Sequence, residues 1–334
     1  MNESKQKQVT NTPANFLPRI IWGTVIVLIV LAFFGLRILS EYVFDFLIAA
    51  LMVLCALEVE NLLHKMDRPT HSVAVAMYPI LSFMCIAITA NTSLNYYHFI
   101  LLNLAILVVM AVVFFAIPLI FHKYGVNSKA RDGYNGSLLY YSFSKSMNTM
   151  FVCLWPTFLM SFAFIVNHFN ALSISGVGEY YGNSGADLGL LGLVLLFATT
   201  MFADTFAMLS GRFIGGPKIS ITKLGPGKSW TGLIGGIAGA CIASIIVYVI
   251  FNAFSIYNGL FASLNISIWT FMLGGVFCGI FNMAGDLFSS LFKRRAVVKD
   301  FSQLIPGHGG IMDRYNGMLV NAVFVFMFLI ILFG

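Results

Sequence analysis

Charged residues are scarce in this sequence. Asp, Glu, Lys and Arg make up 10% of its 334 residues, whereas a soluble domain of average composition carries about 25%. So little charge cannot cover a surface that faces water, which excludes an ordinary soluble globular protein. Apolar residues supply 59% of the chain, and the mean hydropathy is +0.89. The composition therefore predicts a membrane protein.

The sequence also lacks any cysteine pattern that would bind zinc or build a disulfide framework. Its five cysteines show no CxxC spacing and have no histidine close by. All of them fall inside apolar runs, where a cysteine behaves as a small buried hydrophobic residue. They are Cys55, Cys85, Cys153, Cys241 and Cys278.

Long apolar runs dominate what is present. A helix needs about 20 mostly apolar residues to cross a bilayer. The runs are continuous rather than alternating, which favours helices over the strands of a barrel. We therefore predict an all-α polytopic membrane protein with about nine transmembrane helices. The predicted spans are 18–38, 43–62, 72–90, 98–121, 149–167, 187–209, 232–254, 266–288 and 317–333.

The basic residues indicate the orientation. Of the 19 lysines and arginines, all except Arg37 fall in the N-terminal arm or in the connections after the second, fourth, sixth and eighth spans. Such residues accumulate on the cytoplasmic side, so we expect a cytoplasmic N-terminus and, with nine spans, a C-terminus outside. The expected parts are an arm (1–17), N-terminal helices (18–167) and a C-terminal domain (187–334) with cytoplasmic loops 210–231 and 289–316.

Acidic residues occur toward the ends of three predicted spans. Asp204 and Asp286 lie toward the cytoplasmic ends of the sixth and eighth spans. A charge at membrane depth costs about 2.5–3.5 kcal/mol, so such a residue usually faces the bundle interior and marks a functional site. Glu58 and Glu60, at the cytoplasmic end of the second span, are instead expected to reach the membrane interface.

The connection after the sixth span contains the run GPGKSW, residues 225–230. It is not a P-loop, because that motif requires a glycine where this chain has Thr222. What remains is a Gly/Pro turn that presents Lys228 and Ser229 at the start of a helix near Trp230, an arrangement that favours an anion. The glycines that follow, at 232, 235, 236 and 239, predict close helix packing.

The connection after the eighth span combines carboxylates, cations and glycines. Asp286, Asp313 and Asp300 offer hard oxygen ligands without cysteine, which favours Mg²⁺ bound through one or two carboxylates and substrate phosphates. Gly309 and Gly310 would let the backbone approach a ligand closely. The two connections together predict a cytoplasm-facing, Mg²⁺-dependent site for phosphorylated substrates.

The second of these connections resembles the signature of the CDP-diacylglycerol synthases, also called phosphatidate cytidylyltransferases. The pattern S-x-apolar-K-R, four residues, K-D, a PGHGG-type turn and D-R recurs here in order. The connection after the sixth span and the GDLF run at 285–288 are also similar to that family. The matching residues are Ser290, Phe292, Lys293, Arg294, Lys299, Asp300, Ser302, Ile305, Pro306, His308, Gly309, Gly310, Ile311, Asp313 and Arg314, and earlier Asp204, Ala207, Gly211, Arg212, Pro226, Lys228, Trp230 and Gly232.

Several positions depart from the family pattern. Asn316 stands where the signature usually ends in aspartate, and Tyr315 stands where an aliphatic residue is usual. The loss of a negative charge beside Asp313 bears on metal affinity and preference. The other departures are Met208, Gly225, Ser229 and Ser289, where the family prefers Tyr, Ser, Thr and often Glu.

The resemblance implies that CTP and phosphatidate react to give CDP-diacylglycerol and pyrophosphate, with Mg²⁺ on Asp286 and Asp313 and room for a second, monovalent or divalent, cation. It implies a site on the cytoplasmic face of a bacterial plasma membrane, with the lipid entering from the bilayer. No nucleic-acid partner is expected, and a homodimer is left open. The implied catalytic residues are Asp286, Asp313, Lys293, Arg294 and His308, the last binding or orienting substrate. The implied substrate-binding residues are Asp204, Arg212, Lys228, Ser229, Lys299, Asp300, Gly309, Gly310, Arg314 and Asn316.

Three alternatives stay open. Another CTP-dependent lipid enzyme, of the CDP-archaeol synthase or polyprenol kinase type, would use a similar site. A transporter would concentrate its polar residues near mid-bilayer, whereas here they gather in two connections and the adjoining span ends. A purely structural membrane protein would need neither polar connection.

Overall fold

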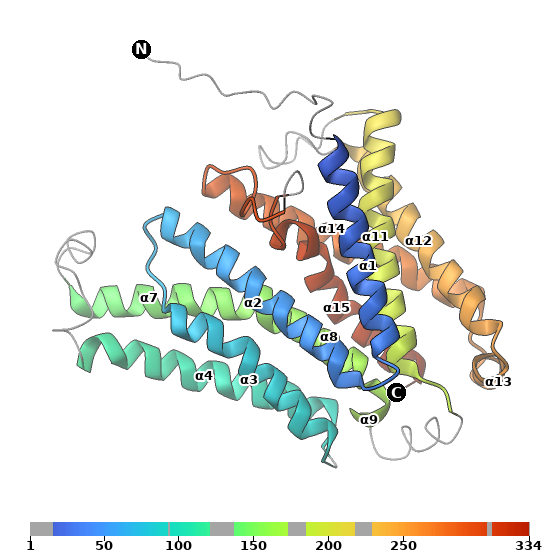
Figure 1. The fold of residues 1–334 in the computed structure, drawn as a ribbon, viewed down its shortest axis with the longest axis horizontal. Coiled ribbons are helices and arrows are strands. Elements are labelled where there is room, and N and C mark those ends of the chain that lie inside the picture. Colours follow the sequence, from blue (N-terminus) through green and yellow to red (C-terminus); the bar gives the residue numbers. More distant parts are fainter. Residues whose placement is uncertain are drawn as a thin grey trace.

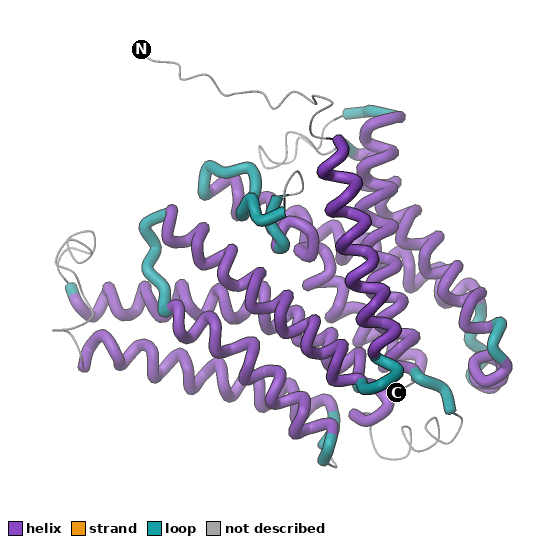
Figure 2. Tube along the Cα trace, viewed as in Figure 1, coloured by secondary structure: helices purple, strands orange, loops and turns teal. Residues whose placement is uncertain are grey.

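Helices account for nearly all the regular structure of the chain (Figures 1 and 2). In the computed structural model, the described residues are 16–92, 94–120, 137–172, 185–217, 229–305 and 309–333, with side chains from Ile21 onward. Within these ranges, strand-type pairing is limited to isolated bridge residues, namely the Ile305–Gly309 pair and Ser229. The all-α prediction is therefore confirmed.

The N-terminal helices follow the predicted spans closely. They are α1 (Phe16–Leu36), α2 (Glu41–Lys65), α3 (Ser72–Ala90) and α4 (Tyr96–Ile120). α2 packs on α3, and α3 packs on α4. Each is apolar over most of its length, so the boundaries fall where polar residues first interrupt the run.

The next span is one long helix with a π turn inside it. Its parts are α7 (Leu138–Val152), η2 (Cys153–Phe158) and α8 (Leu159–Asn167), followed by the short α9 (Phe169–Leu172). Pro156 lies in η2 and has no N–H for the regular pattern, which accounts for the widened turn. The span is 30 residues long. The helix begins at Leu138 rather than at the predicted residue 149. Lys145 and the polar residues near it lower the hydropathy of the first helical turns, so these turns were not recognised.

Four long helices form the C-terminal bundle, with one short helix in a connection. They are α11 (Leu188–Phe213), α12 (Trp230–Asn252), α14 (Ile268–Arg295) and α15 (Met312–Phe333), with α13 (Ser255–Ser263) between α12 and α14. α11 lies along α12, and α14 packs against both α12 and α15 (Figure 1). A Cβ at Gly239 would lie 2.6 Å from the Phe202 carbonyl oxygen, so the predicted close helix packing is confirmed.

The helices extend further into the predicted cytoplasmic loops than hydropathy suggested. α14 continues through its basic end to Arg295, and α15 begins at Met312. The predicted loop 289–316 is therefore shorter, and the loop 210–231 starts only after Phe213. Basic residues in the last turn of α14 are favourable because they face the negative end of the helix dipole.

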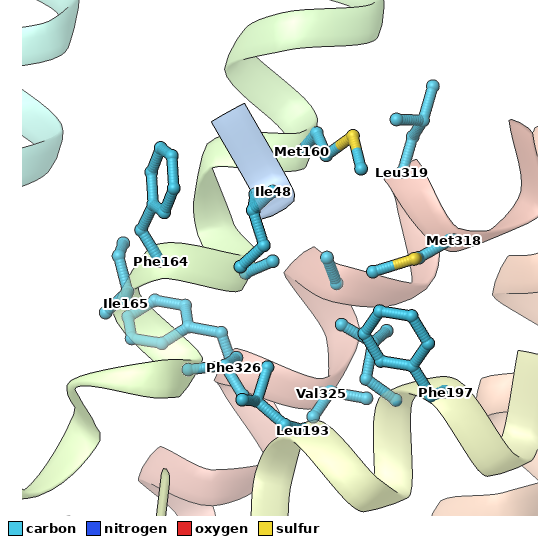
Figure 3. Packing of buried hydrophobic residues seen from close by; sticks show 14 of the residues in the cluster. Ile48, Met160, Phe164, Ile165, Leu193, Phe197, Met318, Leu319, Val325 and Phe326 are labelled. Carbon is cyan, nitrogen blue, oxygen red and sulfur yellow. The ribbon is translucent and has the colours of Figure 1, made fainter. Parts of the chain in front are cut away.

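The main core lies where α2, α8, α11 and α15 meet (Figure 3). Large apolar side chains from all four helices interdigitate there, which ties the N-terminal helices to the C-terminal bundle. The buried residues shown include Ile48, Met160, Phe164, Leu193, Phe197, Leu319 and Val325.

Eight helical segments among the described residues are long and apolar enough to cross a membrane. They comprise α2, α3, α4, the segment from Leu138 to Asn167, α11, α12, α14 and α15. The described apolar part of α1, Ile21–Leu36, is shorter, so the ninth span and the orientation of both termini stay predictions.

The bundle has two distinct ends (Figure 1). α2, α11 and α14 end, and α12 and α15 begin, at what we call the pocket end. α1 and α8 end, and α2 and α11 begin, at the opposite end, which we call the network end. The predicted cytoplasmic connections after the second, sixth and eighth spans thus share the pocket end.

Candidate active site

A pocket of about 570 Å³ opens between α11, α12, α14 and α15 at the pocket end. One face of α14 contributes Gly279, Asn282, Met283 and Asp286, a spacing that repeats with the helical period. The polar and charged lining residues are Asp204, Arg212, Ser229, Asn282, Asp286, Asp313 and Arg314. The fold therefore brings together both predicted polar connections, although they are far apart in the sequence.

Two acids on neighbouring helices border this pocket. Asp204 of α11 accepts a hydrogen bond from Asn282 Nδ2 of α14 at 2.9 Å. Asp286 lies one turn beyond Asn282 on the same face of α14. Asn282 is 3% exposed, and among the described residues its Oδ1 has no hydrogen-bond partner. The carboxylates of Asp204 and Asp286 therefore lie on neighbouring helices along the pocket, and Asn282 holds the first of them.

Asp313, at the start of α15, is tied to three separate parts of the chain. Its Oδ1 lies 2.6 Å from Lys293 Nζ, near the end of α14. Its Oδ2 accepts the backbone N–H of Phe301 at 2.9 Å and that of Gly310 at 3.0 Å. Its side chain is only 6% exposed. Asp313 thus holds the end of α14, the following loop and the start of α15 in one arrangement.

A second carboxylate, that of Glu58 of α2, binds the same turn. It accepts hydrogen bonds from Ser302 Oγ at 2.6 Å, Ile311 N at 2.9 Å and Met312 N at 2.8 Å. Glu58 and Glu60 are 5% and 3% exposed, so both side chains are buried in the protein, and their position relative to the membrane interface stays a prediction. The sequence signal that could have identified Glu58 is an acid near the end of an apolar helix, because such an acid usually has a specific partner.

Glycines allow the two carboxylates to approach the turn. Gly309 has φ +84°, a left-handed conformation that glycine adopts without strain. A Cβ at Gly310 would lie 2.9 Å from Glu58 Cδ. At Gly310, the group that approaches the backbone closely is thus the Glu58 carboxylate of the protein itself. A contact of either glycine with substrate stays a prediction.

Ser229 caps the helix that borders the pocket. Its Oγ accepts the Gly232 N–H at 3.1 Å and lies 2.9 Å from Thr231 Oγ1. The Thr231 hydroxyl in turn donates to the Gly215 carbonyl just beyond α11. The first turn of α12 therefore lies beside Arg212 and Asp204, and the positive end of its helix dipole suits an anionic substrate group.

Some predicted residues lie away from this pocket. Lys299 and Asp300 are exposed and line a separate surface hollow of about 910 Å³ with Asn61, His64 and Lys65 of α2. Arg294 is exposed at the end of α14 and does not line the pocket. Their roles toward substrate stay predictions.

Asn316 also lies outside the pocket lining. It is 5% exposed, and its Oδ1 accepts the N–H of the next residue, Gly317, at 2.7 Å. The residue that departs from the family signature is thus packed inside the start of α15 rather than turned toward the cavity. Lys228 and His308, two further predicted site residues, lie outside the described residues.

The predicted magnesium ligands are compatible with this chemistry. Asp286 and Asp313 line one pocket with Asp204. Mg²⁺ needs only one or two carboxylates when it also binds substrate phosphates, so these oxygen donors suffice. The described residues contain no group of three His, Cys, Asp or Glu side chains arranged to enclose a metal by themselves. Such a site fits Mg²⁺ held through few protein ligands, and its presence stays a prediction.

The helical bundle and its acid-lined pocket define an integral membrane protein with a site for a charged substrate at one end. The chain matches the model of the cytidylyltransferase family over residues 17–332. It therefore belongs to the cytidylyltransferase family.

Curated relatives agree with this assignment. The chain is 36% identical over 136 residues to a phosphatidate cytidylyltransferase of Rickettsia conorii, covering 40% of the chain and 56% of that protein. It is 40% identical over 136 residues to the phosphatidate cytidylyltransferase of Haemophilus influenzae, covering 41% and 44%. A match to the Brucella abortus protein of the same name is 31% identical over 174 residues, covering 52% and 56%. The chain spans about half the length of the curated relatives it matches.

Proposed function

We propose that this protein is a phosphatidate cytidylyltransferase that makes CDP-diacylglycerol and pyrophosphate from CTP and phosphatidate. Membership of the cytidylyltransferase family and similarity to relatives of that name support the reaction class. The observation that carries the proposal is the pocket in which Asp204, Asp286 and Asp313 meet Arg212 and Arg314 at the ends of four apolar helices. A lipid phosphate and a nucleoside triphosphate can meet directly at the boundary between the apolar helices and water.

The reaction requires positioning and charge neutralisation more than proton transfer. An anionic phosphate oxygen of phosphatidate attacks the α-phosphorus of CTP, a new P–O bond forms, and the α–β P–O bond breaks to release pyrophosphate. Because the attacking oxygen is already ionised, no protein base is needed. Arg212 and Arg314 are suited to bind phosphate oxygens, since guanidinium groups offer paired donors.

Lys293 contributes through Asp313, to which it is bonded at 2.6 Å. This pair sets the direction of the Asp313 carboxylate toward the pocket. Mg²⁺, held by Asp286 and Asp313, would neutralise phosphate charge and stabilise the leaving pyrophosphate. The N-terminus of α12 adds a favourable field for an anion next to Ser229.

The position of the pocket also supports an enzyme rather than a carrier. Its charged groups lie toward the ends of α11 and α14 and at the start of α15, whereas a transporter binds its substrate near the bilayer midplane. We further propose that the pocket end faces the cytoplasm of a bacterial cell, where CTP is made. The one-sided distribution of Lys and Arg supports this orientation.

The test is a reconstituted assay. Purified protein in detergent receives Mg²⁺, CTP and phosphatidate, and both the CDP-lipid and pyrophosphate are quantified. We expect stoichiometric formation of the two products, which depends on CTP and on phosphatidate. Absence of both products from the wild-type protein and from Asn316→Asp, next to an active control enzyme, would overturn the proposal.

A further inference from the structure

Glu58 stands apart from the pocket, on a helix that does not border it. It belongs to α2, whereas the pocket is built by α11, α12, α14 and α15. Yet its carboxylate is buried against the turn that leads into α15 and accepts three hydrogen bonds from it. An acid that is buried and fully engaged by one short segment fixes the position of that segment.

Two carboxylates together hold this turn. The backbone N–H of Gly310 binds Asp313, and those of Ile311 and Met312 bind Glu58. Three successive donors at the start of α15, which have no partner within a helix, are therefore satisfied by acids. Because negative groups are favourable at a helix N-terminus, the arrangement is stable only with both acids in place.

The held turn connects directly to the pocket. Asp313 and Arg314, which line the pocket, immediately follow the residues that Glu58 binds. Asp313 also receives Lys293 and the Phe301 N–H, so a shift of the turn would move the carboxylate relative to Asp286 and Asp204. Positioned groups at a reacting centre must be held within a fraction of an ångström to act efficiently.

We propose that Glu58 is a positioning residue of the active site, which acts by fixing Ser302 and the Gly310–Met312 turn so that Asp313 and Arg314 face the pocket. The inference rests on the proposed function, since it concerns the same site. It assigns to an N-terminal helix a direct part in a site whose lining residues all come from the C-terminal bundle.

The chain offers a matched control on the same helix. Glu60 is as deeply buried as Glu58 but receives its hydrogen bond from Thr70 Oγ1, at 2.7 Å, rather than from the turn. Glu58→Gln and Glu60→Gln therefore make the same chemical change at the same depth of α2. An amide side chain can accept at only one of its two terminal atoms, so Glu58→Gln cannot keep both the Ile311 and Met312 bonds.

The experiment compares these two variants with wild type in steady-state kinetics and in hydrogen–deuterium exchange. We expect Glu58→Gln to lower kcat by about 10- to 100-fold, the usual effect of removing a group that orients a reacting side chain. Peptides that contain Ile311 and Met312 should exchange faster in this variant. Glu60→Gln should change neither kcat nor exchange in those peptides.

A milder variant covers the case in which Glu58→Gln fails to fold. Ser302→Ala removes one of the three bonds to Glu58 and leaves α2 unchanged. It should lower kcat by about 2- to 10-fold, in line with the net contribution of one ordinary hydrogen bond, because the two backbone bonds to Glu58 remain. Wild-type kcat in Ser302→Ala together with wild-type exchange at Ile311 and Met312 would overturn the inference.

A second, independent test uses the close contact at Gly310. Gly310→Ala introduces a Cβ beside the Glu58 carboxyl group and should reduce kcat. The shorter acid in Glu58→Asp relieves that contact, so the double variant should retain more activity than the product of the two single effects. Strictly multiplicative losses would contradict a coupling between Glu58 and the turn.

The outcomes separate this inference from the proposed function. If the wild-type protein makes no CDP-lipid, the proposed function fails, and the exchange measurement still decides whether Glu58 holds the turn. If the wild-type protein is active but Glu58→Gln keeps full kcat, Glu58 is not a positioning residue, whatever the exchange shows. Lower kcat with faster exchange in Glu58→Gln alone supports the inference.

Discussion

Charged side chains are buried at both ends of this bundle, but they are used differently. At the network end, Arg37, Asp45 and His168 are 6%, 0% and 2% exposed. Asp45 binds His168 directly, and Asn167 links Asp45 to Arg37. At the pocket end, Asp204, Asp286 and Asp313 border a cavity of about 570 Å³. One set of charges is closed upon itself, and the other faces a space that a substrate can enter.

The network end joins three parts of the chain that lie far apart in the sequence. Arg37 donates to Asn167 Oδ1 at 2.7 Å and to Asp187 at 2.5 Å and 3.1 Å. Asp45 accepts from Asn167 at 2.7 Å and lies 2.5 Å from His168 Nε2. Such a network connects the α1–α2 corner to the end of α8 and the start of α11. It specifies how these elements meet, which is the best supported role for buried ionic groups.

Burial alone therefore does not identify a functional charge in this protein. Asp45 is more deeply buried than Asp204, yet Asn167 and His168 satisfy its carboxylate. Mutations at the two ends should therefore separate stability from activity.

The largest effect is expected at Asp286. Asp286→Asn keeps the size of the side chain but removes the negative charge from the pocket wall. Activity should fall by about 100- to 1,000-fold, because a group that acts on transition-state charge is lost. The unfolding midpoint in detergent should stay near that of wild type. Wild-type turnover in this variant would remove Asp286 from the reaction, and a collapse of the midpoint would place it with the structural charges.

Arg37→Met is the matching change at the network end. It removes the Arg37 donor from Asn167 and Asp187, although Asp187 keeps the Leu190 N–H. Breaking a buried ion pair costs roughly 3 kcal/mol. Asp187 is 39% exposed, so solvent will offset part of that loss. The unfolding midpoint should drop clearly, while kcat per folded molecule stays unchanged at a temperature where the variant is folded. A variant with normal stability and low kcat would reverse the assignment of the two ends.

Much of the pocket was predictable from sequence because its residues stand out locally. Asp204 and Asp286 interrupt apolar runs, and Arg212, Ser229 and Asp313 belong to polar connections, so each carries its own signal. All five line the pocket. Lys299 and Asp300 carried the same signal but lie in a separate hollow, because the path of a loop is set by tertiary contacts that composition does not report.

The residues that were missed depend on distant partners. Glu58 acquires its role from Ile311, which lies 253 positions away, and Asp45 acquires its role from His168 at a separation of 123. Hydropathy assigns both acids only to a helix end. Arg37 was the single basic residue outside the predicted cytoplasmic side, and the network it forms with Asp187 and Asn167 explains that exception.

A pH effect on stability is expected from His168. Burial opposes its charged form, but the hydrogen bonds that the His168 ring donates to Asp45 and Glu41, together with their negative charges, outweigh burial and raise the pKa of His168 from 6.5 to about 9. Because the pKa is higher in the folded state, the stabilisation is complete below about pH 6.5 and is lost as the pH rises through about 9. The unfolding midpoint should therefore decline from neutral to alkaline pH more steeply in wild type than in His168→Gln.

Parallel declines in the two proteins would show that another group controls alkaline stability. Glu41 and Asp45 are the acids that contact the His168 ring, and the Tyr42 ring lies 5.0 Å from it. Activity per folded molecule should not follow the His168 titration, because the residue lies at the end opposite to the pocket.

The smallest effect is expected at Ser229, which lies at the pocket end but has a structural contact of its own. Ser229→Ala removes the oxygen that accepts the Gly232 N–H, and loss of an N-cap costs about 1 kcal/mol. Ser229→Thr keeps a hydroxyl at the same position and should preserve the cap. We therefore expect the unfolding midpoint to fall slightly in the alanine variant and to stay unchanged in the threonine variant. Equal midpoints in all three proteins, combined with a raised KM for CTP in Ser229→Ala alone, would contradict this structural role. Ser229 would then be a substrate-binding residue, and the functional residues would extend to the start of α12.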